Sequence, residues 1–346
     1  MDLLTAGMIR TPGRSMEEDT TMLKDTVKIN QLVLRNRIVM PPMATGKADH
    51  GRPDENLNAY YAARARGTAL IIVEHEYISP EGMAHDNQLS MADDSVIPAY
   101  RKLTDAVHEQ GAAVFAQLNH AGAQAKDTGL PAISPSGISL QNREPAPKVM
   151  AVEDIEHIKE SFVLAALRAQ AAGFDGVEIH SAHGYMLNQF YSPLTNHRTD
   201  AYNGQSLEGR TRLHAEILRA VREAVGDDYP VAIRFGACDY MEGGSRIEEI
   251  PETSRIFEEA GADMLDISGG RGGFTVKGRT QPGWFAELSI PARNSVQIPV
   301  LLTGGIITAD DAEQLLQENA ADLIGVGRAM MKDADWSVKA LDEADR

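Results

Sequence analysis

The sequence has a single cysteine, Cys238, among 346 residues. One cysteine cannot form an intrachain disulfide, and it cannot supply an all-cysteine zinc or iron–sulfur site. Long apolar runs are also missing, so no segment is suited to cross a bilayer. The first residues are partly acidic and lack the apolar core of a signal peptide. We therefore expect a cytoplasmic protein with no membrane partner.

The sequence also has fewer basic than acidic residues. Lys and Arg number 33 against 50 Asp and Glu, which gives a net charge of −17. Nucleic-acid binding needs clustered cations, so we expect no nucleic-acid partner. The rest of the composition, 43% apolar and 24% charged, is typical of a soluble domain with a sizeable core. We expect residues 1–24 to be a loose extension and residues 25–346 to form one domain.

Short apolar segments recur along the chain, with helical patterns between them. The eight segments are Ile38–Met40, Leu70–Val73, Ala113–Leu118, Gly176–Ile179, Val231–Phe235, Met264–Ile267, Val300–Leu302 and Leu323–Val326. Most are continuous, which is typical of parallel strands buried on both faces. Strand followed by helix about eight times predicts an α/β fold, a (β/α)₈ TIM barrel. A doubly wound open sheet is the alternative, but it would normally carry an early glycine-rich nucleotide motif, and none is present.

A hairpin is predicted ahead of the barrel. Residues 26–36, TVKINQLVLRN, alternate polar and apolar side chains across Asn30-Gln31. We expect this hairpin to cap the bottom of the barrel. The longest irregular stretch, residues 122–149, is rich in Pro, Ser and Gly and is expected to border a site.

Polar or glycine-rich residues follow all eight predicted strands. Barrel enzymes carry their chemistry at the C-terminal strand ends, so these residues are our candidates for a site. In chain order they are Pro42, Met43, Ala44 and Thr45; Glu74 and His75; Gln117, Asn119 and His120; His180, His183 and Tyr185; Arg234; Ser268, Gly269 and Gly270; Thr303, Gly304 and Gly305; and Gly327 and Arg328.

The last two strand ends favour a phosphate site. The motifs LLTGGI and GVGR each lead from a strand toward a helix, and unobstructed backbone N–H groups at glycines suit an anion. Barrels often bind phosphate at the loops after strands seven and eight. Either motif alone would indicate only a tight turn, but the two together, with Arg328 attached, favour phosphate.

His180, His183 and Tyr185 follow the fourth strand in quick succession. Three interpretations are open. The histidines could be structural, or they could bind zinc together with a histidine such as His75 or His120. They could also donate hydrogen bonds to a carbonyl or phenolate oxygen, with Tyr185 as the proton donor. The third interpretation uses all three residues.

Two polar side chains within strands are ambiguous. Arg234, in the fifth strand, needs an anion or hydrogen-bond acceptors, and a structural salt bridge would also satisfy it. Gln117, in the third strand, could satisfy the backbone or read the edge of a heterocycle.

Taken in chain order, these motifs resemble the Old Yellow Enzyme family of FMN-dependent NAD(P)H:flavin oxidoreductases and ene reductases. The resemblance is carried by RNRIVMPPMATG, AQLNHAG, AISPSGI, AGFDGVEIHSAHGYMLNQFYSPLTNHRTDAYNG, VAIRFGA, LLTGGI and DLIGVGRAMMKD. The resemblance spans roughly residues 27–336, nearly the whole chain. The central block is highly specific.

The resemblance implies a TIM barrel that holds FMN without a covalent bond. The implied cofactor-binding residues are Pro41, Pro42, Met43, Ala44, His75, Gln117, Arg234, Ser268, Gly304, Gly305, Gly327 and Arg328. Within this set, Gln117 would bond the pyrimidine edge of the flavin, and Arg234 would face N1 and the C2 oxygen. The last four residues would hold the phosphate.

The implied reaction is ping-pong hydride transfer. NADH or NADPH reduces flavin N5 and leaves, and an α,β-unsaturated carbonyl compound then binds with its oxygen on His180 and His183. Hydride returns from N5 to the β-carbon, and Tyr185 protonates the α-carbon. The alternatives are a flavin-dependent amine C–N oxidase or demethylase, a non-flavin barrel lyase or isomerase that binds a phosphorylated substrate, and a flavin-binding sensor. The chain is a possible homo-oligomer.

The sequence departs from the family pattern in places. Ala44 stands where Cys or Thr is common, and the first strand looks more like the dienoyl-CoA reductase branch. A single cysteine cannot supply the 4Fe–4S cluster of that branch, so we expect electrons to come directly from a nicotinamide or from a separate protein. The motif NHRTDAYNG is expected to be a structural bracket. Residues 269–285 are expected to cover the site, with Phe274 and Trp284 toward substrate, or else to be a solvated basic loop.

Overall fold

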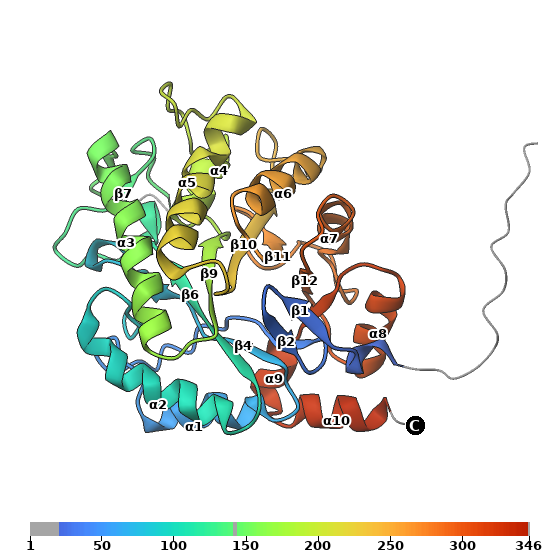
Figure 1. Cartoon of the computed structure of the whole chain (residues 1–346). Coiled ribbons are helices and arrows are strands. Elements are labelled where there is room, and N and C mark those ends of the chain that lie inside the picture. Colours follow the sequence, from blue (N-terminus) through green and yellow to red (C-terminus); the bar gives the residue numbers. More distant parts are fainter. Residues whose placement is uncertain (1–20, 141–143, 345–346) are drawn as a thin grey trace, which may run out of the picture.

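The computed structural model describes residues 21–140 and 144–344, which form a closed barrel of parallel strands ringed by helices (Figure 1). The barrel strands are β3 (Ile38–Met40), β4 (Leu70–Ile72), β6 (Ala113–Asn119), β9 (Gly176–Ser181), β10 (Val231–Cys238), β11 (Met264–Gly269), β12 (Val300–Thr303) and β13 (Leu323–Gly325). Pairing of β13 with β3 and of β4 with β6 closes the ring. The predicted TIM barrel is confirmed, and each predicted apolar segment is one of its strands.

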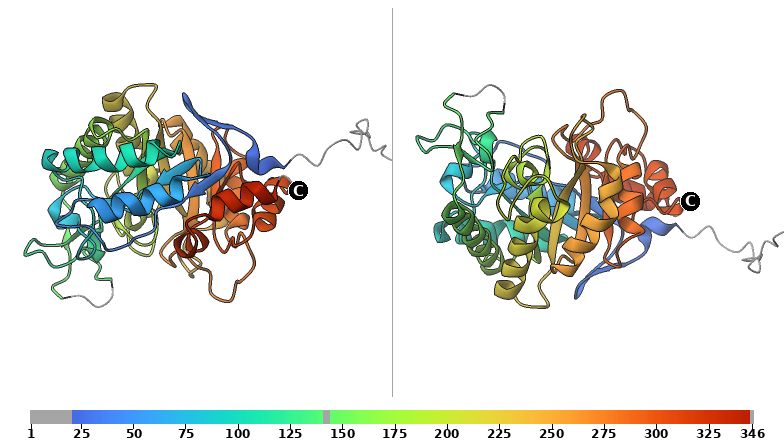
Figure 2. Two further views of the ribbon diagram at one scale, coloured as in Figure 1. Left: turned by 90° about the horizontal axis from the view of Figure 1, so that it is seen from below. Right: turned by 90° about the horizontal axis from the view of Figure 1, so that it is seen from above.

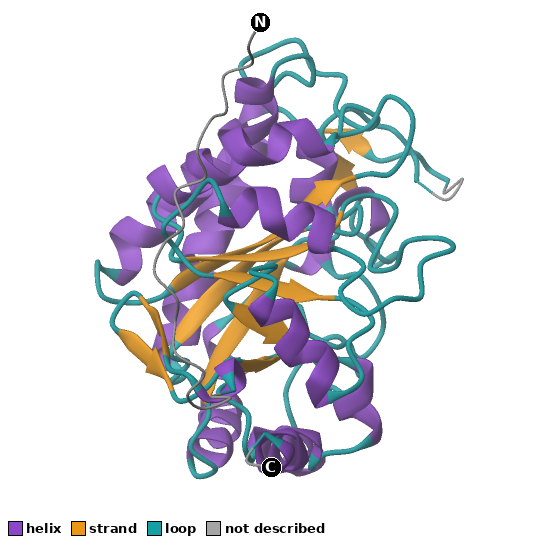
Figure 3. Ribbon diagram, turned by 90° about the vertical axis from the view of Figure 1, so that its right-hand side faces the viewer, coloured by secondary structure: helices purple, strands orange, loops and turns teal. Residues whose placement is uncertain are grey.

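Helices separate the strands and form the outer layer (Figure 3). They are α1 (Glu55–Ala65), α2 (Ile97–His108), α3 (Val152–Ala171), α4 (Met186–Tyr191), α5 (Leu207–Val225), α6 (Ile250–Glu259), α7 (Ala286–Arg293), α8 (Ala309–Gln317), α9 (Arg328–Lys332) and α10 (Trp336–Glu343). The expected capping box of α8 is present, because Thr308 Oγ1 accepts from Asp311 N. Across the described residues, no helix is both long enough and apolar enough to span a membrane.

The minor elements lie in the connections. β5 (Glu76–Tyr77) continues the second strand beside β6, and β7 (Ile133–Ser134) pairs with β8 (Lys148–Val149) in the long loop after β6. Single 3₁₀ turns are η1 (Met22–Lys24), η2 (Pro80–Gly82), η3 (Asp94–Val96), η4 (Gly122–Gln124) and η5 (Ile247–Glu249).

The hairpin β1 (Val27–Ile29) and β2 (Leu32–Leu34) caps one end of the barrel, as predicted. Asn30 makes the turn with φ of 53°, a conformation that asparagine tolerates well. Ile29 and Leu34 are buried in an apolar cluster with barrel residues such as Phe115 and Met264. Figure 2 shows the hairpin on the opposite end of the barrel from the long loops that follow β6 and β11.

The expected N-terminal extension is only partly visible. Residues 1–20 lie outside the described residues. Residues 21–24 dock onto α8, where the backbone N–H groups of Met22 and Leu23 donate to the carboxylate of Glu313 at 2.9 and 3.0 Å. Leu23 is buried against the core.

Gly176 is required by the packing of the barrel bottom. It pairs in register with Phe115, and a Cβ at this position would lie 2.5 Å from Phe115 Cε1. We expect Gly176→Ala to lower the free energy of unfolding by about 1–3 kcal/mol, because a buried ring must move aside. Urea unfolding measures the loss. The double variant Gly176→Ala/Phe115→Leu should be less destabilised than the two single changes added together, and strict additivity would contradict this account.

Candidate active site at the carboxyl end of the barrel

Four polar side chains lie together inside the barrel, on neighbouring strands. Gln117 on β6 is the register partner of Glu178 on β9, and Gln117 Nε2 donates to Glu178 Oε1 at 2.7 Å. Arg234 on β10 is the register partner of Asp266 on β11, with Arg234 Nε 3.3 Å from Asp266 Oδ2. The parallel ladder therefore brings two carboxyl groups, one amide and one guanidinium into a single buried cluster.

Burial sets the charge of this cluster. It raises the pKa of Glu178 well above its usual range, and the neighbouring Asp266 raises it further. Burial also raises the pKa of Asp266 to about 6, although the Arg234 cation opposes that rise. Burial therefore favours the protonated form of Glu178, and the Arg234 cation favours the charged form of Asp266. Neither carboxyl was singled out from the sequence, because one acid within an apolar strand gives no periodic signal.

His180, His183 and Tyr185 form a compact aromatic group at the end of β9. The ring of His180 lies 5.2 Å from that of His183 and 5.4 Å from that of Tyr185. Burial lowers the pKa of both histidines well below 6.5, and the Arg234 cation lowers each further. Burial raises the pKa of the Tyr185 phenol above 10.0. The site thus presents two neutral imidazoles beside a protonated phenol.

A strained turn orients this group. His183 has φ of 60° and Gly184 has φ of 74°, and the left-handed region is unfavourable for histidine. Gln124 Nε2 donates to the His183 carbonyl at 3.1 Å, and Gly184 N donates to Asn188 Oδ1 at 2.8 Å. His183 Nε2 lies 2.8 Å from Ser268 Oγ, a predicted site residue that lies near the end of β11. Strain held by this many contacts is typical of functional sites.

His75, after β4, joins the same group. Its ring lies 5.3 Å from that of Tyr185 and 6.2 Å from that of His180. Burial lowers its pKa to about 3, with smaller contributions from His85 and Arg234, so His75 is neutral. Its Nδ1 lies 2.8 Å from Gln88 Nε2. His85 and Gln88 come from an irregular loop and were not predicted from the sequence.

The segment after β3 meets the segment after β13, since these strands are neighbours. A Cβ on Gly327 would lie 2.7 Å from Met43 Sδ and 3.4 Å from Pro41 Cγ. The glycine therefore allows the two segments to touch. Pro42 is partly exposed and Ala44 is exposed. Thr45 N and Oγ1 donate to the buried Glu74 at 2.6 and 2.5 Å, which fixes the course of the segment.

The predicted phosphate residues are also neighbours in space. Gly304 and Gly305 have φ of 137° and 70°, values that side chains disfavour. The indole of Trp284 lies across both glycines, with Nε1 2.7 Å from the position of a Cβ on Gly304. The guanidinium of Arg328 lies 5.0 Å from the centre of the Trp284 ring. We expected Trp284 to be on a cover facing substrate, but it is 7% exposed and packs on this turn.

Other polar residues singled out in the sequence lie apart from the group. His120 Nδ1 accepts from Gly122 N, and its Nε2 lies 3.7 Å from Glu81. Asn196 Nδ2 donates to the carbonyls of Phe190 and Tyr202 at 2.9 Å each, as suits a bracket. Within residues 21–140 and 144–344, no group of three metal-binding side chains converges.

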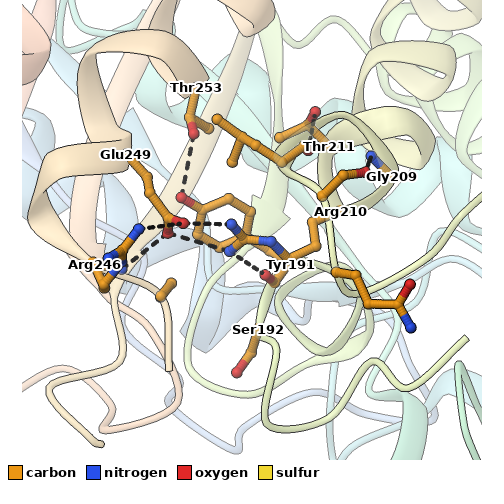
Figure 4. A network of polar contacts seen from close by, with 12 residues as sticks. Tyr191, Ser192, Gly209, Arg210, Thr211, Arg246, Glu249 and Thr253 are labelled. Carbon is orange, nitrogen blue, oxygen red and sulfur yellow. Dashed lines mark hydrogen bonds and ion pairs between the residues drawn. The ribbon is translucent and has the colours of Figure 1, made fainter. Parts of the chain in front are cut away.

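A separate cavity lies beside the bracket. Its volume is about 820 Å³, and it is lined by residues 193–210 and 241–249 in part and by none of the predicted site residues. Figure 4 shows the ion pair at its wall, where Arg210 reaches Glu249 through both terminal nitrogens at 2.5 and 3.2 Å. This pair ties the first turn of α5 to η5, which precedes α6.

Comparison with known proteins identifies the family to which the chain is similar. The profile of the NADH:flavin oxidoreductase / NADH oxidase family matches residues 24–345. The chain is 41% identical over 323 residues to an NADH oxidase of Thermoanaerobacter brockii, covering 90% of this chain and 50% of that protein. It is 36% identical over 315 residues to an NADPH dehydrogenase of Halalkalibacterium halodurans, covering 90% and 91%. The chain thus spans about half the length of the first relative and most of the second.

Two solved structures share the fold. One is 2-naphthoyl-CoA reductase in complex with 2-naphthoyl-CoA, with a TM-score of 0.88 and 26% identity, covering 93% of this chain and 52% of that one. The other is a morphinone reductase variant in complex with tetrahydroNAD, with a TM-score of 0.80 and 25% identity, covering 93% and 91%.

Proposed function

Because the chain belongs to the NADH:flavin oxidoreductase / NADH oxidase family, we propose that it transfers hydride from NADH or NADPH, through FMN, to an activated carbon–carbon double bond. The substrate class is an α,β-unsaturated carbonyl compound. The observation that carries this proposal is the neutral pair His180 and His183 beside the protonated Tyr185. We further propose that residues 25–346 act as one domain.

FMN is the cofactor of this family, and the residues of the barrel fit it. Polar atoms that the described residues leave buried and without a hydrogen bond indicate where a ligand would bind. They include Thr303 Oγ1 and Trp284 Nε1. The Gln117 amide nitrogen donates to Glu178. The side-chain carbonyl oxygen of Gln117 therefore remains to accept a hydrogen bond from an N–H at the pyrimidine edge. A flat heterocycle with an anionic tail satisfies this set.

The chain's own residues supply three functions in the proposed reaction. When bound, FMN supplies the hydride chemistry. His180 and His183 donate hydrogen bonds to the substrate carbonyl oxygen, and these bonds strengthen as negative charge develops there, which favours the transition state. Tyr185 keeps its proton because burial raises its pKa, and it delivers that proton to the α-carbon. The buried site excludes water from this transfer.

The purified protein tests the proposal directly. It should be yellow, NADH or NADPH should bleach it without oxygen, and an enone should restore the colour. An N-methylated amine offers no carbonyl oxygen to the histidines and should not reduce the oxidised protein. Colourless protein that does not take up FMN, or amines that outperform enones, would contradict the proposal.

The pH dependence of alkene reduction follows from the same pKa shifts. His180 and His183, with pKa values well below 6.5, are neutral at and above that pH, and Tyr185, whose pKa burial raises above 10.0, is protonated well below that pH. We expect the rate at which an enone reoxidises the reduced protein to show no inflection near pH 6.5 and no loss up to about pH 9. Single-turnover rates across this range give the profile. An inflection near pH 6.5 that disappears in His180→Asn would show that this histidine titrates.

A second substrate class has support from one solved structure. The 2-naphthoyl-CoA reductase complex has a TM-score of 0.88 to this chain, which favours unsaturated acyl thioesters as well as free enones. Phe274, in segment 269–285, is 67% exposed, and its ring lies 6.0 Å from that of His183, where it can meet the acyl group. Steady-state kcat/KM for an enoyl thioester against the matching enone separates the two classes.

A further inference from the structure

Trp284 buries a hydrogen-bond donor that nothing in the described protein accepts. Its side chain is 7% exposed, and Nε1 makes no hydrogen bond. A buried N–H without an acceptor costs about 1–3 kcal/mol, so folded proteins rarely leave one unless a ligand completes it. The other tryptophan of the chain shows the ordinary arrangement, because Trp336 Nε1 donates to the Ile307 carbonyl at 2.7 Å.

The unpaired donor lies among the residues expected to hold an anion. Nε1 lies over Gly304, and the hydroxyl of the preceding residue, Thr303, is also buried without a partner, on the side of Gly325. The Arg328 guanidinium lies 5.0 Å from the centre of the indole ring. One neutral donor, one cation and a glycine turn therefore meet at one place, and an anion with several oxygens would satisfy all of them.

We propose that Trp284 belongs to the phosphate site of the cofactor, where the indole N–H donates to a phosphate oxygen beside Gly304, Gly305 and Arg328. Trp284 then makes the site select FMN over riboflavin, the same flavin without phosphate. This inference rests on FMN as the cofactor of the family and is independent of the substrate that is reduced.

The test compares two flavins on the full-length protein stripped of its cofactor. Trp284→Phe keeps an aromatic ring on the glycines and removes the N–H. We expect its Kd for FMN to rise about 10- to 100-fold, the usual effect of losing one hydrogen bond to a charged group, and its Kd for riboflavin to stay within about two-fold. Titration calorimetry or quenching of flavin fluorescence gives both constants. Trp336→Phe is the matched control, because it removes an indole N–H whose acceptor is protein, and its ratio of the two constants should equal that of wild type.

Two results would overturn the proposal. If Trp284→Phe weakens both flavins equally, the residue supports packing alone. If Trp284→Phe strengthens FMN binding, the wild-type indole blocks the phosphate position and does not donate a hydrogen bond to the phosphate. Trp336→Phe protein, in which Trp284 is the one remaining tryptophan, provides an assay that does not need the Trp284 variant to fold. Inorganic phosphate should change its fluorescence and should compete with FMN more than with riboflavin, and an unchanged spectrum would also refute the proposal.

Discussion

Tyr185→Phe is expected to slow alkene reduction by about 10²- to 10⁴-fold, the usual loss when a positioned general acid is removed. Reduction of the protein by NADH or NADPH should stay within about two-fold of wild type, because that step needs no proton from the phenol. The ring itself is kept, so its packing 5.3 Å from His75 and 5.4 Å from His180 should survive.

Anaerobic rapid mixing measures the two steps separately, first with a nicotinamide and then with an enone. Tyr191→Phe is a matched control at the other end of α4, because it removes a buried hydroxyl that lies 3.2 Å from Thr253 Oγ1 and outside the site. It should leave both rates near wild type. Equal slowing of both steps in Tyr185→Phe would show that the tyrosine is not the proton donor.

His180→Ala should reduce the rate of alkene reduction by about 10²- to 10³-fold, as expected for loss of one hydrogen bond to a developing oxyanion. Phenols, which imitate the enolate of the reaction, should bind more weakly by a similar factor. FMN should remain bound, because the side chains that fit it come mainly from other strands. Absorbance titration with a phenol gives the Kd, and gel filtration followed by a spectrum gives the flavin content.

Ser268→Ala provides a graded comparison for that result. The Ser268 hydroxyl lies 2.8 Å from His183 Nε2, so its removal loosens one imidazole without deleting it. The loss should be smaller, about ten-fold. Loss of FMN from His180→Ala protein would instead make this histidine part of the cofactor site.

The barrel was predictable because continuous apolar runs indicate buried parallel strands directly. All eight predicted runs fall on barrel strands, and strand ends differ by at most three residues, as for β9, which continues to Ser181. Helix α4 was missed because its six residues are too few to show a helical period. The hairpin was predicted from its alternation and from Asn30-Gln31 at the turn.

The candidate site was predictable where residues follow strands and unpredictable where loops fold back. His180, His183, Tyr185 and Arg234 are ordered along the chain by the strands themselves. His85 and Trp284 come from irregular segments, whose path depends on packing that no local pattern encodes. The roles of Glu178 and Asp266 could be recognised only from the register between strands. That register places Glu178 beside Gln117 and Asp266 beside Arg234.

Arg234 and His180 are register partners on neighbouring barrel strands, whereas Phe274 lies in the irregular segment between β11 and α7 and is 67% exposed. The spacing between the cation and the imidazole is therefore inherited from backbone geometry common to every barrel of this kind. Natural variation can change the exposed part of this segment around Phe274 without altering that spacing. In such an architecture, a change of loop sequence can alter which substrate binds. The barrel strands, and with them the cofactor site, stay the same.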